Sequence, residues 1–228
     1  MRLAGVREVG QTPRGHSGRM GFLAWDNNTY YQSRLLRALP RQCERVLDVG
    51  CGKGVFATKL AQRARHVDAL DVSPEMIDQA KKLVPGNVTC RLGDVNEIPL
   101  PEAGYDAITS ISALHHLSLP DVLPKLAAAL RPGGVLIAVA HHRNEWPRDL
   151  LPLGLGLLTV YSRRAVLLAV PSARRYRRAH DESGMPIREP GLTIREVRDQ
   201  VRQALPEARV RRLLQWRYEL IMEKSPRG

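Results

Sequence analysis

The sequence predicts a single α/β domain built on a doubly wound, seven-stranded sheet that is mostly parallel and ends in an antiparallel edge hairpin. The first observation is that short apolar runs typical of buried strands alternate with segments of helical period. The second is the length of 228 residues, which suits one sizeable domain. The third is a composition of 43% hydrophobic and 25% charged residues, which is ordinary for globular proteins and excludes wholesale disorder.

The strand and helix signals follow one another in a regular order. The run VLDVG (46–50) predicts a first strand, 55–64 has helical period and 66–73 predicts a second strand, which together form a βαβ unit. The other expected elements are a helix over 30–39 that Pro40 ends, a helix over 74–83, strands over 87–94, 105–112 and 134–140, helices over 121–130 and 194–205, and two closing strands within 210–224. Since parallel strands need crossover connections, we expect helices on both faces of the sheet.

Cysteine usage and hydropathy restrict the class of protein. The three cysteines, Cys43, Cys51 and Cys90, are odd in number and lack C-x-x-C spacing, which disfavours a disulfide framework and a thiolate zinc site. We therefore expect a cytoplasmic protein that holds no metal. No apolar run has the length of a signal peptide or of a membrane span, so secretion and membrane insertion are not expected.

The net charge of +12 lies mainly in the C-terminal part of the chain, where residues 141–228 hold 18 Arg and Lys against 10 Asp and Glu. Such an excess favours an anionic partner, whether a nucleic acid, a phosphorylated substrate or an anionic membrane surface. A solvated arginine surface is the alternative, because Arg outnumbers Lys 29 to 6 and GC-rich coding alone can produce that ratio.

The segment VLDVGCGKG (46–54) carries the strongest chemical signal, because it follows a strand and opens a helix. Gly50, Gly52 and Gly54 allow a tight turn and a close approach of the backbone to a ligand, and the N-terminus of the helix attracts an anion. Asp71 ends the next strand, 21 residues after Gly50, where a carboxylate can accept hydrogen bonds from both hydroxyls of a ribose. The combination predicts a nucleotide-like ligand at the carboxyl ends of the strands.

The spacing G-x-G-x-G, with Asp48 two residues before the first glycine, resembles motif I of class I S-adenosylmethionine-dependent methyltransferases, especially those that act on small molecules. Three further segments resemble the family's motifs in the same order: Asp71 in ALDVSPEMI, Gly93-Asp94 in RLGDVNEIPLP, and LRPGGVLI (130–137). The resemblance implies a Rossmann-like fold and methyltransferase activity, with S-adenosyl-L-methionine as cofactor and S-adenosyl-L-homocysteine as product.

The resemblance also assigns residues to the methionine end of the cofactor. Gly50, Cys51 and Gly52 would pass beneath the methionine part, and the Asp48 carboxylate would lie near its ammonium group. An aromatic residue of this family lies over the sulfonium, and Tyr30 is the candidate here, with the following tyrosine as the alternative.

At the adenosine end, the resemblance gives Asp71 the ribose and four further residues the adenine. Val72 and Met76 would line the ring. Asp94 would accept a hydrogen bond from the adenine amino group, and Val95 would offer its backbone N–H.

Histidines gather after the fourth and fifth expected strands, with His115 and His116 at the first position and His141 and His142 at the second. In the family, the loop after the fourth strand borders the transferable methyl group. His115, His116 and His141 are therefore candidates for a general base, with His115 placed first. Packing of the imidazoles at the strand ends is the alternative, and some members need no base because alignment of nucleophile, methyl and sulfur provides much of the acceleration.

The resemblance leaves residues 141–190 without a counterpart in the sheet. This insertion contains an apolar stretch from Leu150 to Val170, broken by proline and glycine, and a basic cluster follows it. We expect a lid on the acceptor side of a single methyltransferase domain that spans 22–224, and a membrane-surface helix is the alternative. Residues 1–21 are expected to form a flexible arm and 225–228 a tail.

The expected function is methyl transfer from S-adenosyl-L-methionine to an oxygen or nitrogen atom of a small molecule in specialised metabolism. One alternative is an RNA or peptide methyltransferase that uses the basic C-terminal half, although the chain lacks the target-base motif N-P-P-Y. The other is a non-catalytic accessory subunit that binds the cofactor. The sequence leaves open the identity of the acceptor, and whether the protein is a monomer or a homodimer.

Overall fold

Seven strands form one sheet in the order β3-β2-β1-β4-β5-β7-β6. The computed structural model describes residues 27–145, 189–214 and 216–226, the first four of them by backbone alone. The strands are β1 (Cys43–Val49), β2 (Ala64–Asp71), β3 (Val88–Leu92), β4 (Tyr105–Ile111), β5 (Leu130–His141), β6 (Arg209–Arg212) and β7 (Arg217–Glu223). From β3 to β5 neighbours pair in parallel, whereas β7 runs antiparallel to β5 and β6 antiparallel to β7. The predicted mixed sheet with its antiparallel edge hairpin is therefore confirmed.

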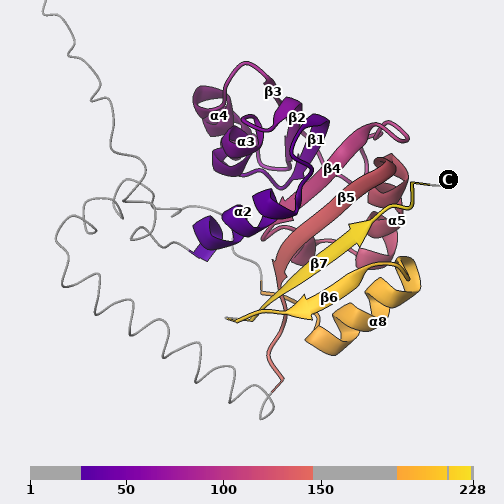
Figure 1. Cartoon of the computed structure of the whole chain (residues 1–228). Helices are drawn as coiled ribbons and strands as arrows, with labels where there is room; N and C mark the ends of the chain where they lie inside the picture. Colours follow the sequence, from indigo (N-terminus) through magenta and orange to yellow (C-terminus); the bar gives the residue numbers. More distant parts are fainter. Residues whose placement is uncertain (1–26, 146–188, 215, 227–228) are drawn as a thin grey trace, which may run out of the picture.

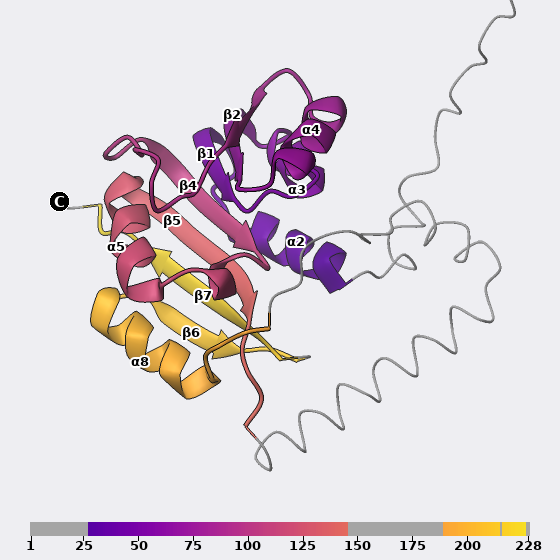
Figure 2. The same ribbon diagram turned by 180° about the vertical axis from the view of Figure 1, so that it is seen from behind.

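Helices cover both faces of this sheet, as Figures 1 and 2 show. They are α2 (Asn27–Ala38), α3 (Val55–Leu60), α4 (Pro74–Leu83), the short 3-10 helix η1 (Leu114–His116), α5 (Leu119–Ala129) and α8 (Ile194–Ala204). Alternate residues of a strand point to opposite faces. Along β5, Ile137 therefore packs in a buried cluster with residues of α2 and α3, while Leu136 packs in a second buried cluster with residues of α5 and α8.

Several predicted boundaries differ from the structure by a few residues, and strand pairing explains the two largest differences. The helix expected over 55–64 ends at Leu60, because the chain already enters β2 at Ala64, where it pairs with Cys43. The last strand of the parallel set begins at Leu130 and not at 134, because Leu130 already pairs with Tyr105 of β4, ahead of an irregularity in the ladder between Tyr105 and Ala107.

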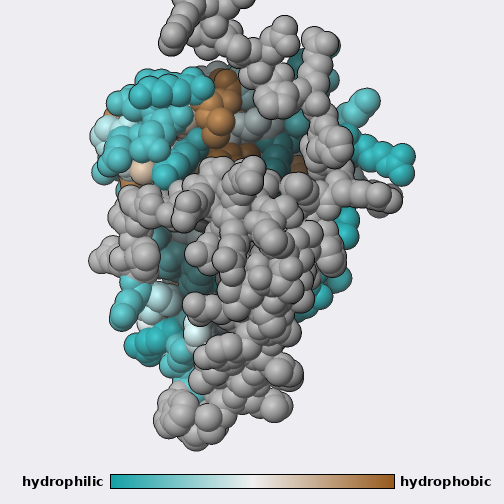
Figure 3. Space-filling view, turned by 90° about the vertical axis from the view of Figure 1, so that its left-hand side faces the viewer, coloured by the Kyte–Doolittle hydropathy of each residue, from teal (hydrophilic) through white to brown (hydrophobic). Residues whose placement is uncertain are grey.

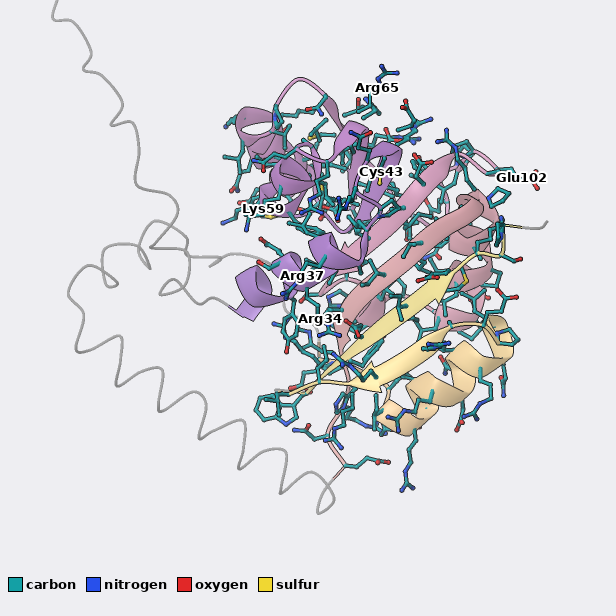
Figure 4. All side chains as sticks on the ribbon, viewed as in Figure 1. Arg34, Arg37, Cys43, Lys59, Arg65 and Glu102 are labelled. Carbon is teal, nitrogen blue, oxygen red and sulfur yellow. The ribbon has the colours of Figure 1, made fainter. Side chains whose placement is uncertain are left out.

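An ion pair ties the first described helix to the edge hairpin. Arg34 of α2, labelled in Figure 4, donates from Nη2 to Oε2 of Glu219 on β7 at 3.0 Å, and its Nε contacts the other carboxylate oxygen. The Glu219 side chain is buried, so this pair is screened less than a surface pair. The contact fixes α2 across the carboxyl half of the sheet, next to the strand ends that form the site.

No helix in the described ranges is long and apolar enough to cross a bilayer. On the side of the molecule shown in Figure 3, the described residues that are visible are mainly hydrophilic, with one small apolar area among them.

Helix α8 is fixed at its start by a reciprocal capping box. The Thr193 hydroxyl accepts a hydrogen bond from the backbone N–H of Glu196 at 3.3 Å, and the Glu196 carboxylate accepts one from the backbone N–H of Thr193 at 2.7 Å. These two bonds satisfy two of the donors that a helix N-terminus leaves without a partner. The helix then buries Ile194, Val197 and Val201 against the sheet.

We expect Thr193→Ala to lower the free energy of unfolding by about 1 kcal/mol, because the cap bond is lost. Chemical denaturation of the full chain is the measurement. Ser118→Ala is the matched control, since Ser118 holds the same position at the start of α5 but makes no side-chain cap bond. Equal losses in the two variants would show that the Thr193 cap contributes no specific stability.

Candidate functional site

A pocket of about 180 Å³ lies at the carboxyl ends of the parallel strands. This is the position where open α/β sheets bind ligands, at the point where the strand order reverses between β1 and β4. Its walls come from the ends of β1, β2 and β4 and from the loops that follow β1 to β4. The lining residues are Val49, Gly50, Gly52, Leu70, Asp71, Val72, Met76, Gly93, Asp94, Val95, Ile111, Ser112, Ala113, His116 and Leu117.

The glycine loop forms the floor of this pocket. Gly50 has φ +73°, and a Cβ placed on it would lie 2.2 Å from the Cβ of Ala113 in the loop after β4. Any larger residue would therefore separate these two loops, which explains why the turn requires glycine. The backbone N–H groups of Gly50 and Cys51 both donate to the carbonyl of Leu70, at 2.8 and 2.9 Å, so the loop is held against the end of β2.

Asp71 both lines the pocket and braces the loop. Its Oδ2 accepts from the backbone N–H of Gly52 at 2.8 Å, and its Oδ1 accepts from the backbone N–H of Ser73 at 2.9 Å. A carboxylate has about four acceptor sites, so acceptor capacity remains for further donors in the pocket. These two bonds fix the carboxylate in one orientation before any ligand binds.

Asp48 is a buried carboxylate with one unsatisfied oxygen. Thr109 Oγ1 donates to its Oδ1 at 2.9 Å, while Oδ2 has no hydrogen-bond partner among the described residues. Burial raises the pKa of Asp48 to about 7; the Thr109 hydrogen bond opposes this shift and the nearby Asp71 charge adds to it. A cation that reached Oδ2 would compensate this cost, and the ammonium group of an amino acid is such a cation.

The residues expected around adenine gather at the other end of the pocket. Val72, Met76, Asp94 and Val95 all line it, with Met76 and Val95 buried and Val72 exposed. The carboxylate of Asp94 is held by the backbone N–H of Asn96, which donates to its Oδ1 at 2.8 Å.

Cys51 takes part through its backbone only. Its side chain is buried and does not line the pocket, and its Sγ–H lies 3.6 Å from the carbonyl of Gly52. Burial raises the pKa of the Cys51 thiol far above its usual range. The thiol is therefore not a nucleophile at neutral pH.

Three of the candidate histidines form one cluster beside the pocket. The ring of His115 lies 3.9 Å from that of His116 and 4.9 Å from that of His141, measured between centroids. Only His116 lines the pocket. Burial, followed by the electrostatic influence of neighbouring side chains, lowers the pKa of His115 to about 3 and that of His141 to about 4. Both rings are therefore neutral at physiological pH and are weak proton acceptors.

The other expectations near the site divide between described and undescribed residues. The side chain of Tyr30 and the stretch from Leu150 to Val170 lie outside the described residues. Tyr31 is described, and it is core: it is buried, and its hydroxyl donates to the carbonyl of Leu214 at 3.3 Å.

Ser112 and Arg217, which no sequence motif marks, lie at or beside the pocket. Ser112 lines the pocket with φ +58°, an unusual backbone conformation for a residue with a side chain. Arg217 is only 8% exposed, and its Nη1 donates to the Ser112 hydroxyl at 3.1 Å. No local pattern marks Arg217, because the antiparallel ladder brings it opposite His141 from a distant part of the chain.

Within the described ranges, no group of His, Cys, Asp and Glu side chains has the arrangement of a metal site. The residues present suit S-adenosyl-L-methionine instead. The unsatisfied oxygen of Asp48 is suited to the ammonium group of the cofactor, and the fixed carboxylate of Asp71 to its ribose. The backbone at Gly50 has no side chain, which suits the part of the cofactor between these two groups.

Comparison with known sequences supports this interpretation. A family described as a methyltransferase domain matches residues 46–134. An uncharacterised methyltransferase of Mycobacterium tuberculosis is 33% identical over 205 residues, which cover 89% of this chain and 98% of that protein. A malonyl-[acyl-carrier protein] O-methyltransferase of Serratia marcescens is 38% identical over 95 residues, which cover 41% of this chain and 37% of that protein.

Solved structures share the fold. A SAM-dependent methyltransferase from Aquifex aeolicus superposes with a TM-score of 0.56 at 20% identity, covering 90% of this chain and 93% of that one. An N-methyltransferase from Bradyrhizobium japonicum gives a TM-score of 0.55 at 14% identity, covering 87% and 96%. Together with the near full-length Mycobacterium relative, these results show that the chain is an S-adenosyl-L-methionine-dependent methyltransferase of the class I family.

Proposed function

We propose that the protein transfers the methyl group of S-adenosyl-L-methionine to an oxygen or nitrogen atom of a small molecule in a biosynthetic pathway. The observation that carries the proposal is the pocket at the carboxyl ends of the strands. Its lining includes the glycine loop, Asp71 and Asp94, and also Ser112 and His116 from the segment after β4. The Serratia relative, which is named a malonyl-[acyl-carrier protein] O-methyltransferase, supports oxygen as one acceptor atom.

In this proposal, the residues at the cofactor end bind and orient. Asp71 accepts hydrogen bonds from the ribose hydroxyls while it holds the loop through Gly52. Asp94 accepts from the adenine amino group, and Asp48 neutralises the ammonium. The bound cofactor supplies a methyl group that its sulfonium activates toward nucleophiles. The rigid loop fixes that end, so the remaining requirement is to align the acceptor atom with it.

At the acceptor end, His116 is the histidine that we assign to direct contact with the acceptor, because it is the one that lines the pocket. His115 packs against the His116 ring, and His141 packs against His115. A general base works best when its pKa lies near the operating pH, and the pKa values of about 3 and 4 fall well below that range. We therefore assign positioning roles to His115 and His141 and place His116 ahead of His115 as the candidate catalytic residue.

The first test of the function follows the methyl group. Incubation of the full chain with methyl-labelled S-adenosyl-L-methionine and an extract of the organism that encodes it should place label in the low-molecular-weight fraction, because the pocket suits a small acceptor. Size separation of the products is the measurement, and RNase and protease treatment is the control. Label that stays with RNA or protein would overturn the small-molecule proposal in favour of a macromolecular acceptor.

The second test concerns Asp71. Asp71→Asn keeps the shape of the side chain but removes its charge and one acceptor, so S-adenosyl-L-homocysteine should bind about tenfold to a hundredfold more weakly. Calorimetric titration is the measurement, with thermal unfolding to verify that the variant is folded. Asp78→Asn on the exposed side of α4 is the matched control. Wild-type affinity in a folded Asp71→Asn protein would remove Asp71 from the ribose site.

The third test uses the raised pKa of Asp48. Because the carboxylate form binds the ammonium, the affinity for S-adenosyl-L-homocysteine should fall as the pH decreases below about 7. Asp48→Asn should bind weakly, with little pH dependence over that range. At pH 6 Asp48 of the wild type is largely protonated, so binding of the ammonium must release a proton. Calorimetric titration in two buffers of different ionisation enthalpy measures this release.

The same shift predicts the opposite trend for the protein without ligand. Between about pH 4 and 7 the folded chain binds more protons at Asp48 than the unfolded chain does, so Asp48 makes the free energy of unfolding fall as the pH rises through this window. Asp48→Asn should remove that contribution. Identical pH slopes of affinity in wild type and Asp48→Asn would contradict the assignment of Asp48 to the ammonium.

A further inference from the structure

The acceptor end of the pocket is bordered by a buried arginine. Arg217 begins β7 directly opposite His141 in the antiparallel ladder, which brings it to the carboxyl ends of the parallel strands. Its guanidinium lies 5.1 Å from the centroid of the Tyr31 ring, and its Nη1 donates to the hydroxyl of Ser112, which lines the pocket. The fork of Arg217 is therefore one residue away from the pocket itself.

Three clustered imidazoles lie near Arg217 and Ser112, and together these side chains form one wall of the site. His116 lines the pocket, His115 packs against it, and His141 packs against His115 at the position that faces Arg217 in the ladder. The Arg217 charge is among the causes that lower the pKa values of both His115 and His141. The wall therefore combines one permanent cation with the imidazoles of His115 and His141, which stay neutral at physiological pH and can donate hydrogen bonds.

We propose that this wall, formed by Arg217, Ser112 and the clustered histidines, binds the carboxylate group of the acceptor, and that the methyl group is transferred to an oxygen of that carboxylate. The inference rests on the proposed function, because it names the acceptor class of the same site. The planar guanidinium of arginine matches a carboxylate in shape and charge, and a half-buried site strengthens that attraction.

The chemistry of the cluster favours a carboxylate over other acceptors. A hydroxyl or ammonium nucleophile must lose a proton, and two of the three imidazoles are weak acceptors for it. A protonated amine would also be repelled by Arg217. A carboxylate arrives deprotonated: its oxygen forms the new C–O bond as the methyl–sulfur bond breaks, the electron pair remains on sulfur, and an anion and a sulfonium become a neutral ester and a neutral thioether without proton transfer.

The first experiment determines the bond that is made. The full chain is incubated with methyl-labelled S-adenosyl-L-methionine and the low-molecular-weight fraction of an extract of the organism that encodes it, and the labelled product is treated with mild base. A carboxylic ester releases volatile labelled methanol, whereas N-methyl groups and ethers do not. Release of the label as methanol is the expected result. Small-molecule label that withstands base would overturn this inference and leave the proposed function intact, whereas label absent from small molecules would overturn the proposed function.

The second experiment tests the residue. Arg217→Gln should reduce labelled ester formation about tenfold or more through loss of a charge-assisted pair, while affinity for S-adenosyl-L-homocysteine stays within a few fold of wild type. Arg217→Lys keeps the charge but loses the planar guanidinium, so its rate of ester formation should lie between those of the wild type and Arg217→Gln. This second variant keeps the test valid if Arg217→Gln fails to fold. Arg209→Gln on the exposed side of β6 is the matched control. Full ester formation in a folded Arg217→Gln protein would show that the carboxylate is bound elsewhere.

Discussion

The structure of the site depends on how the end of β2 holds the glycine loop. The carbonyl of Leu70 accepts two backbone N–H groups of the loop, and the Asp71 carboxylate accepts a third from Gly52. These bonds fix the loop in a left-handed turn, and only that turn leaves Gly50 without a side chain where Ala113 of the neighbouring loop must lie. Three hydrogen bonds therefore join the ends of β1 and β2, and the close approach of Gly50 to Ala113 adds the loop after β4 to the same pocket.

The buried carboxylate of Asp48 carries an energetic cost in the folded chain. Burial disfavours its charged form, and Thr109 satisfies only one of its two oxygens. A ligand that binds only the folded state stabilises that state, so a cationic group at Asp48 would raise the free energy of unfolding by an amount that grows with ligand concentration relative to its Kd. Backbone strain and unsatisfied polar groups are tolerated in proteins mainly at functional sites. Ser112, which has a positive φ, lines the pocket.

The parts of the molecule that local sequence determines were predictable. The alternation of apolar runs and helical periods gave the strand set, and glycine spacing with Asp71 located the loop, because each signal spans few residues. Long-range pairing was not predictable in the same way. It sets the start of β5 at Leu130 and the position of Arg217, and it also decides which histidine reaches the pocket: His115 and His116 are adjacent in sequence, and only the geometry of η1 separates them.

The two ends of the pocket therefore have different origins. The cofactor end is built almost wholly from residues 46–95, inside the segment that matches the methyltransferase domain family. The acceptor end also depends on His141 and Arg217, which lie beyond that segment and meet only through the pairing of β5 with β7. Because folds of this kind support many chemistries through the residues added around a common site, the family match determines the cofactor and leaves the acceptor open. Acceptor chemistry must therefore be inferred from the antiparallel edge of the sheet, where the permanent positive charge of Arg217 lies opposite His141 and beside the pocket.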